Sequence, residues 1–173
     1  CFIITSLIHY SRNFLILDAL KKGKSIDLNI ILGGATLSPR FTSARFNVKE
    51  ILKKDGYKNV YEIYFNMEGD NQITKAKTIG LGIIEFSSIF NTLKPDLVVV
   101  RGDRFEMLSA AVAAANMNIT VAHIEGGDIS GTIDESIRHA ITKLSHYHFA
   151  TNEDSKNRII KGCTFCGIPA EKF

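Results

Sequence analysis

The sequence predicts an α/β fold, a Rossmann-like parallel sheet with helices on both faces. Short apolar segments of strand composition alternate with segments of helical period, which is typical of βαβ units. Residues 97–100 form a continuous β-rich run, as expected for a central strand buried on both faces. The 173 residues fit one compact domain, and no repeat, low-complexity stretch or linker divides them.

Each expected strand is a short apolar run. In chain order the strands are CFIIT (1–5), DLNIIL (27–32), NVYEIY (59–64), DLVVVR (96–101), TVAHI (120–124) and HYHFA (146–150). Helices are expected in the gaps, over residues 11–22, 46–54, 71–93, 104–117, 133–145 and 153–161. The fifth helix has a predicted buried stripe at helical spacing: Ile133, Ile137, Ala140, Ile141 and Leu144.

Charge and length indicate a small-molecule partner. The net charge is +3 with acids and bases mixed along the chain, so we expect neither nucleic acid nor a membrane surface as a partner. The opening CFIITSLI lacks a basic region and is shorter than the roughly 20 residues of a bilayer span, which predicts a cytoplasmic protein. Cys1, inside an apolar run where Met would be expected, indicates a fragment cut at its N-terminus.

Cysteines and histidines give no metal site. Three cysteines are too few for a disulfide framework, and the lone CxxC of Cys163 and Cys166 lacks partners at zinc spacing. We interpret this pair as ordinary thiols. His146 and His148 lie in or beside a strand and are interpreted as core or surface residues rather than ligands.

Polar residues gather after three of the expected strands, in residues 33–41, 101–106 and 125–134. In open parallel sheets, ligands bind outside the carboxyl ends of the strands. In VVVRGDRFE, Asp103 and Glu106 have the spacing of a helix capping box, which is one interpretation. In the other, Asp103 faces the ligand crevice and Arg104 holds a phosphate.

The segment AHIEGGDISGTIDESIRHAITKLSH has the densest group of polar residues. Glu125 ends an apolar strand, and Gly126 and Gly127 permit a sharp turn or close approach to a ligand. Burial at this strand end would raise the pKa of Glu125 towards values useful for proton transfer. The alternative is a structural carboxylate bonded to the glycine-rich turn.

Thr132 and Glu135 have capping-box spacing, which places Asp134 in the first turn of the following helix. The helix dipole favours ionised Asp134 there, as suits a base. The alternative for Asp134 is an ordinary ion pair with Arg138, four residues on. His139 fits a similar pair with Glu135 as well as it fits a catalytic role.

The segments RGDRFE, AHIEGGDISGTIDESIRHAITKLSHYHFA and KTIGLGIIEFSSIFNTLKPDLVVV together resemble the hydrolysing UDP-N-acetylglucosamine 2-epimerases, with weaker similarity over nearly the whole chain up to about Lys161. The resemblance implies conversion of UDP-N-acetylglucosamine to N-acetylmannosamine and UDP, towards sialic acids. The alternative within the family is a UDP-diacetamido-sugar 2-epimerase for legionaminic-type acids, and non-hydrolysing relatives return UDP-N-acetylmannosamine. The resemblance further implies that residues 1–173 are the N-terminal Rossmann-like half of a two-domain, glycosyltransferase-B-like enzyme whose second domain is absent. It also implies that homodimers form.

Carried over by this resemblance, the catalytic carboxylates are Asp103, Glu125 and Asp134. Substrate contacts are expected at Ser11, Arg104, Gly126, Gly127, Arg138 and His139. The implied mechanism removes the proton from carbon 2 while UDP leaves carbon 1, and water then adds with inversion at carbon 2. Several carboxylates suit these proton transfers, and no metal or other cofactor is implied.

The chain also departs from the family pattern. The Arg-Ala-Asp-Tyr motif after the first strand is replaced, with Leu7 for the arginine and His9 for the aspartate, and Thr36 replaces a common histidine. The ending GCTFCGIPAEKF departs too. These changes motivate an alternative of another class, a truncated or degenerate nucleotide-sugar-binding domain without turnover. An unrelated Rossmann nucleotide-binding domain is disfavoured, because no GxGxxG follows the first strand and no P-loop occurs.

Overall fold

The chain folds around a six-stranded parallel sheet with the strand order β3-β2-β1-β4-β5-β6. The structure is a computed structural model and describes residues 1–39, 47–69 and 71–164. Its strands are β1 (Phe2–Ile4), β2 (Asn29–Leu32), β3 (Asn59–Glu62), β4 (Leu97–Arg101), β5 (Thr120–Ile124) and β6 (Tyr147–Phe149). The predicted fold class is confirmed. The strand order reverses between β1 and β4, where such sheets bind ligands at their carboxyl edge.

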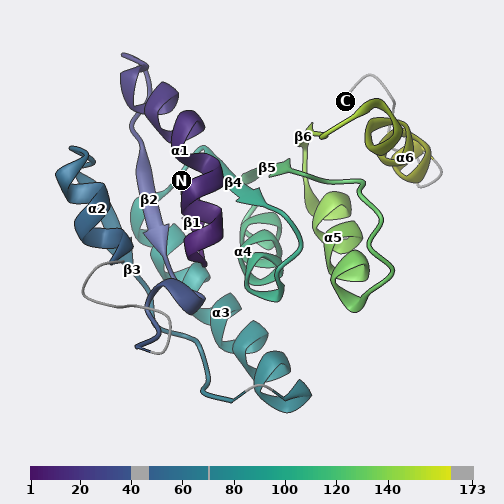
Figure 1. The fold of residues 1–173 in the computed structure, drawn as a ribbon, viewed down its shortest axis with the longest axis horizontal. Helices are drawn as coiled ribbons and strands as arrows, with labels where there is room; N and C mark the ends of the chain where they lie inside the picture. Colours follow the sequence, from purple (N-terminus) through teal and green to yellow (C-terminus); the bar gives the residue numbers. More distant parts are fainter. Residues whose placement is uncertain (40–46, 70, 165–173) are drawn as a thin grey trace.

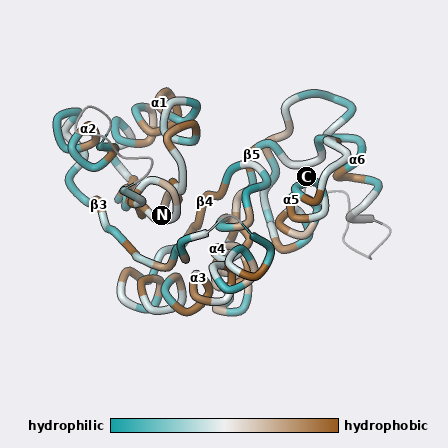
Figure 2. The backbone as a smooth tube through the Cα atoms, turned by 60° about the horizontal axis from the view of Figure 1, so that its bottom comes forward, coloured by the Kyte–Doolittle hydropathy of each residue, from teal (hydrophilic) through white to brown (hydrophobic). Residues whose placement is uncertain are grey.

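Helices form a layer on each side of the sheet (Figure 1). Figure 2 shows α1 and α2 on one side of the strands and α3 and α4 on the other. The helices are α1 (Leu7–Lys22), α2 (Val48–Lys54), α3 (Gln72–Leu93), α4 (Phe105–Asn116), α5 (Ile133–Leu144) and α6 (Glu153–Thr164). Each helix from α1 to α5 lies between two successive strands that run in the same direction, as the predicted βαβ alternation requires, and α6 follows β6.

Two apolar cores lie on the two faces of the sheet, because successive strand side chains point to opposite faces. Towards α1 and α2 the core contains Phe2, Ile4, Leu17, Ile30, Leu32 and Leu52. Towards α3, α4 and α5 it contains Ile3, Ile31, Phe86, Val98, Val100, Met107 and Ile141. Both cores hold the carboxyl edge of the sheet in place.

Three details differ from the sequence prediction. Helix α1 begins at Leu7 rather than at residue 11, because the Ser6 hydroxyl accepts the His9 N–H at 3.2 Å and caps the helix earlier. An unpredicted 3₁₀ turn, Gly34–Thr36, follows β2. Ile133, which was predicted to belong to the buried stripe of α5, is 74% exposed, whereas Ile141 of the same stripe is fully buried.

None of the helices in the described part of the chain is both long and apolar enough to cross a membrane. The side chains of Cys163 and Cys166 lie outside the described residues, so the interpretation of this pair stays a prediction.

Candidate functional site

The loops after β4 and β5 lie side by side at the carboxyl edge of the sheet. Arg101 is in register with Ile124, and the Gly102 N–H donates to the Ile124 carbonyl at 2.9 Å. Asp103 and Glu125 therefore follow the ends of two neighbouring strands. This is the edge where a parallel sheet of this order binds ligands.

Glu125 is held by an arginine that the sequence analysis did not single out. Its Oε1 accepts from Arg101 at 2.5 Å, and the same guanidinium donates to Asn13 Oδ1 at 2.7 Å and to the Arg12 carbonyl at 2.8 Å. The hydrogen bond from Arg101 lowers the pKa of Glu125 and outweighs the opposing effect of burial. The expectation of a raised pKa is therefore wrong, and Glu125 is ionised at neutral pH.

The backbone of Glu125 is also unusual. Its φ is +67°, in the left-handed region that few residues other than glycine adopt. Such a conformation costs on the order of 1 kcal/mol and persists only where the surroundings impose it. Backbone hydrogen bonds hold the chain here, since the Glu125 N–H donates to the Phe149 carbonyl at 2.9 Å and the preceding Ile124 carbonyl accepts from Gly102 at 2.9 Å.

Asp103 pairs with a distant arginine rather than capping the next helix. Its Oδ2 accepts from Arg138, and another nitrogen of that guanidinium donates to the Asp128 carbonyl at 2.6 Å. The N-cap position of α4 is Arg104, whose side chain makes no capping bond. The capping box proposed for Asp103 and the Asp134–Arg138 ion pair are therefore both wrong, because Arg138 and Asp103 bond each other.

A buried histidine connects the two loops to α5. His123 Nε2 lies 2.9 Å from the Gly102 carbonyl, which only accepts hydrogen bonds, so Nε2 carries the hydrogen. Nδ1 lies 3.1 Å from the Thr142 hydroxyl, and the one hydrogen of that hydroxyl is shared between Nδ1 and the Arg138 carbonyl, to which it donates at 3.0 Å. Burial lowers the pKa of His123 to about 4, so the ring is neutral. The His123 side chain thus contacts both Gly102, which precedes Asp103, and Thr142 of α5, the helix that carries Arg138.

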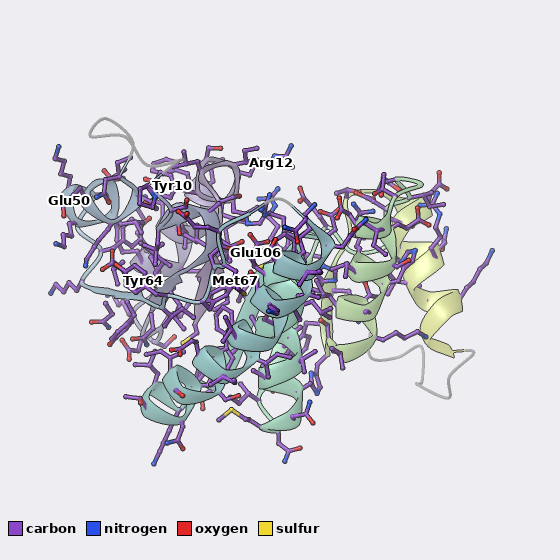
Figure 3. The ribbon with its side chains drawn as sticks, turned by 90° about the horizontal axis from the view of Figure 1, so that it is seen from below. Tyr10, Arg12, Glu50, Tyr64, Met67 and Glu106 are labelled. Carbon is purple, nitrogen blue, oxygen red and sulfur yellow. The ribbon has the colours of Figure 1, made fainter. Side chains whose placement is uncertain are left out.

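Arg104 is engaged by a buried carboxylate. Its Nε and a terminal nitrogen donate to Glu106 at 3.1 and 2.8 Å, and Glu106 is only 1% exposed. Figure 3 shows Glu106 near the start of α4. Burial alone would lower the pKa of Arg104, but the bonds to Glu106 and the charges of Asp134 and Asp103 raise it. Asp103 and Asp134 therefore both act on one guanidinium, although they lie on different elements.

Asp134 is exposed in the first turn of α5 and makes no hydrogen bond or ion pair with the described residues. Its neighbour Glu135 does not form the predicted box with Thr132. Instead, Glu135 Oε2 accepts from the N–H groups of Ser130 and Gly131 at 2.9 and 2.7 Å. His139 lies 3.5 Å from Glu135 Oε1, as the ion-pair alternative predicts.

The glycines and Ser11 have local structural roles. Gly127 has φ +80°, and a Cβ there would lie 2.3 Å from the Ser155 carbonyl oxygen of α6. A Cβ on Gly126 would lie 3.0 Å from both His123 Nδ1 and Thr142 Oγ1. The exposed Ser11 donates to the Ile8 carbonyl at 3.0 Å. Packing alone thus accounts for the two glycines, and their predicted substrate contacts, like that of Ser11, stay predictions.

Two surface pockets lie away from the carboxylates. One is lined by Gly34, Leu37, Ser38, Pro39, Ile63, Tyr64, Phe65, Asn66 and Glu68. The other is lined by His148, Ala150, Thr151, Asn152, Glu153, Lys156, Ile159 and Ile160. Neither is lined by Asp103, Glu125 or Asp134, whose side chains instead stand partly or fully exposed at the sheet edge.

A model of the family described as UDP-N-acetylglucosamine 2-epimerase matches residues 18–164. A relative from Legionella pneumophila named UDP-N,N'-diacetylbacillosamine 2-epimerase (hydrolyzing) is 41% identical over 84% of this chain and 38% of its own length. A Neisseria meningitidis UDP-N-acetylglucosamine 2-epimerase is 31% identical over 84% of this chain and 37% of its own length. The chain thus spans less than two-fifths of these relatives.

A solved structure supports the fold. The Methanocaldococcus jannaschii UDP-GlcNAc 2-epimerase, in complex with UDP-GlcNAc and UDP, matches 99% of this chain and 44% of its own with a TM-score of 0.75 and 28% identity. The six-stranded sheet corresponds to the N-terminal half of such glycosyltransferase-B-like structures.

Proposed function

Because the chain belongs to the UDP-N-acetylglucosamine 2-epimerase family, we propose that it is the N-terminal domain of a hydrolysing nucleotide-sugar 2-epimerase. The observation that carries the proposal is the pairing of two family carboxylates with arginines at adjacent strand ends: Glu125 with Arg101, and Asp103 with Arg138. These pairs fix two carboxylates at the edge of the sheet where a ligand would bind.

The carboxylates have different environments, and this supports different roles. Glu125 is kept ionised by Arg101, so it suits acceptance of the proton from carbon 2 as UDP leaves carbon 1. Asp134 is exposed and has no partner among the described residues, so a substrate can approach it. The negative charges of Asp103 and Asp134 also help to raise the pKa of Arg104. We propose that Asp103 and Asp134 complete the set needed for the addition of water at carbon 2.

For the substrate we propose a UDP-linked 2,4-diacetamido sugar of the diacetylbacillosamine type rather than UDP-N-acetylglucosamine. The support is the higher identity to the diacetylbacillosamine relative, 41% against 31%. The alternative expected from the sequence therefore takes precedence over the first interpretation. Assaying both UDP-sugars and identifying the products by mass spectrometry tests the choice. Preferential turnover of UDP-N-acetylglucosamine would contradict it.

The test of the reaction uses the chain joined to the C-terminal part of the Legionella relative. We expect UDP release from the diacetamido substrate, and we expect Asp103→Asn and Glu125→Gln each to reduce it at least about 100-fold. Glu153→Gln is the matched control, since Glu153 is a 77% exposed carboxylate on α6. Binding of UDP-sugar without any release would instead favour a binding domain without turnover, which the departures at Leu7, His9 and Thr36 motivate.

A further inference from the structure

A second buried imidazole lies beside the carboxylates and is used by no step proposed above. His9 is in the first turn of α1 and is only 7% exposed. Its Nδ1 lies 3.4 Å from the Thr5 hydroxyl. Nε2 makes no hydrogen bond with the described residues. One ring nitrogen is therefore fixed by the protein and the other is available.

The available nitrogen borders a gap over Gly102. A Cβ built on Gly102 would lie 3.9 Å from His9 Nε2 and 3.9 Å from Glu125 Oε2, at ordinary contact distance from both. Gly102 has φ +78°, which favours glycine, so this gap stays open. An imidazole nitrogen and a carboxylate oxygen therefore face the same small space at the end of β4.

Burial and the neighbouring guanidiniums keep the ring neutral. Burial is the largest cause that lowers the pKa of His9, to about 4, followed by the guanidiniums of Arg104, Arg101 and Arg12. Glu125 acts in the opposite direction and does not compensate. At neutral pH the ring offers a hydrogen bond but holds no proton that it could transfer as an acid.

We propose that His9 is a substrate-binding residue, which hydrogen-bonds the sugar nucleotide in the gap over Gly102, opposite Glu125. This rests on the proposed function. The residue that the family resemblance implies at this position is an aspartate, and the arginine implied two residues earlier is Leu7. Two opposite charges are thus replaced by two neutral groups. His9 supplies polar contact with the substrate and no charge.

Two variants of the joined protein test this, His9→Gln and His9→Leu. Leucine approximates the volume of the ring without its nitrogens, and glutamine retains a donor and an acceptor. We expect His9→Leu to raise KM about tenfold with kcat within about twofold, because the bond is made in both ground and transition states. His9→Gln should restore most of the affinity. Calorimetric titration of the 173-residue chain with the UDP-sugar provides a readout that is independent of turnover.

His146→Leu is the control for removal of an imidazole elsewhere: His146 precedes β6 at the other end of the strands from the carboxylates, and its Nδ1 accepts from the Val121 N–H at 3.2 Å, so its loss should leave KM unchanged. Wild-type KM and affinity in His9→Leu would overturn the proposal. A large fall of kcat in both His9 variants with unchanged KM would also overturn it, because it would show proton transfer rather than binding. Absence of both turnover and binding in the wild-type protein would instead reject the proposed function itself.

Discussion

Arg138 in α5 donates both to the Asp103 carboxylate, 35 positions away in sequence, and to the Asp128 carbonyl. The Arg138 side chain is 10% exposed and that of Asp103 is 28% exposed, so water screens the pair only partly. One guanidinium thereby joins the loop after β4, the loop after β5 and the helix that carries Asp134. The position of Asp103 depends on this arginine.

Replacing this arginine should destabilise the fold. Arg138→Met leaves Asp103 without its cation and the Asp128 carbonyl without its donor, and we expect the free energy of unfolding to fall by about 2 kcal/mol. Lys53→Met is the control. It removes an exposed pair with Glu50 and should cost less than about 0.5 kcal/mol. Urea unfolding measures both free energies. Equal losses in the two variants would show that the Arg138–Asp103 pair stabilises the fold no more than an exposed pair does.

The buried neutral histidines should make stability depend on pH between about 6.5 and 4. The pKa of His123 is about 4 in the fold against the ordinary 6.5, so its contribution is complete above pH 6.5 and decreases as the pH falls. At pH 5 this amounts to roughly 2 kcal/mol for one such group. His9 and His148, both lowered to about 4, act in the same direction.

Urea unfolding of the wild type and of His123→Gln at pH 7 and pH 5 measures this dependence. The difference between the two pH values should be smaller in His123→Gln, because glutamine does not titrate. An identical difference in both proteins would assign the pH dependence to other groups.

The fold was predictable because every strand and helix follows from local composition. All six strands and six helices occur in the predicted order. The start of α1 was missed because TSLIH continues an apolar run, and only the chain turn at Ser6 shows that its hydroxyl caps a helix. The spacing of residues along the sequence does not predict that turn.

The site was predictable only in part. As predicted, Asp103 and Glu125 follow the ends of neighbouring strands at the carboxyl edge of the sheet, but the sequence analysis assigned them local partners. The partners in the structure lie on other elements: Arg138 of α5 pairs with Asp103, and Arg101 at the end of β4 pairs with Glu125. Arg101 carried a signal, since a charged residue that ends an apolar strand must find a partner. His123 carried none, because a histidine within a strand looks like any other core residue.

Arg101 should set the acid limit of turnover. Arg101→Met removes the hydrogen bond that lowers the pKa of Glu125, while burial continues to raise it, so that pKa should rise. If Glu125 is the base, the acid limb of the kcat/KM profile moves to higher pH in the joined protein. Lys53→Met again is the control and should leave the profile in place. An unmoved acid limb in Arg101→Met would show that Glu125 does not limit the reaction as a base.

Alanine substitutions at Gly127 and Gly131 distinguish the cost of backbone strain from the cost of a steric clash within one loop. Both have positive φ, +80° and +70°, but a Cβ on Gly127 would lie 2.3 Å from the Ser155 carbonyl oxygen, whereas nothing lies within 4 Å of one on Gly131. Gly131→Ala should therefore cost only the conformational term, about 1 kcal/mol. Gly127→Ala must also push α6 away from the loop after β5 and should cost about 3 kcal/mol in total. Because that loop begins at Glu125, Gly127→Ala should reduce turnover of the joined protein as well. Equal stabilities in urea would mean that α6 moves away at no cost and does not support the Glu125 loop.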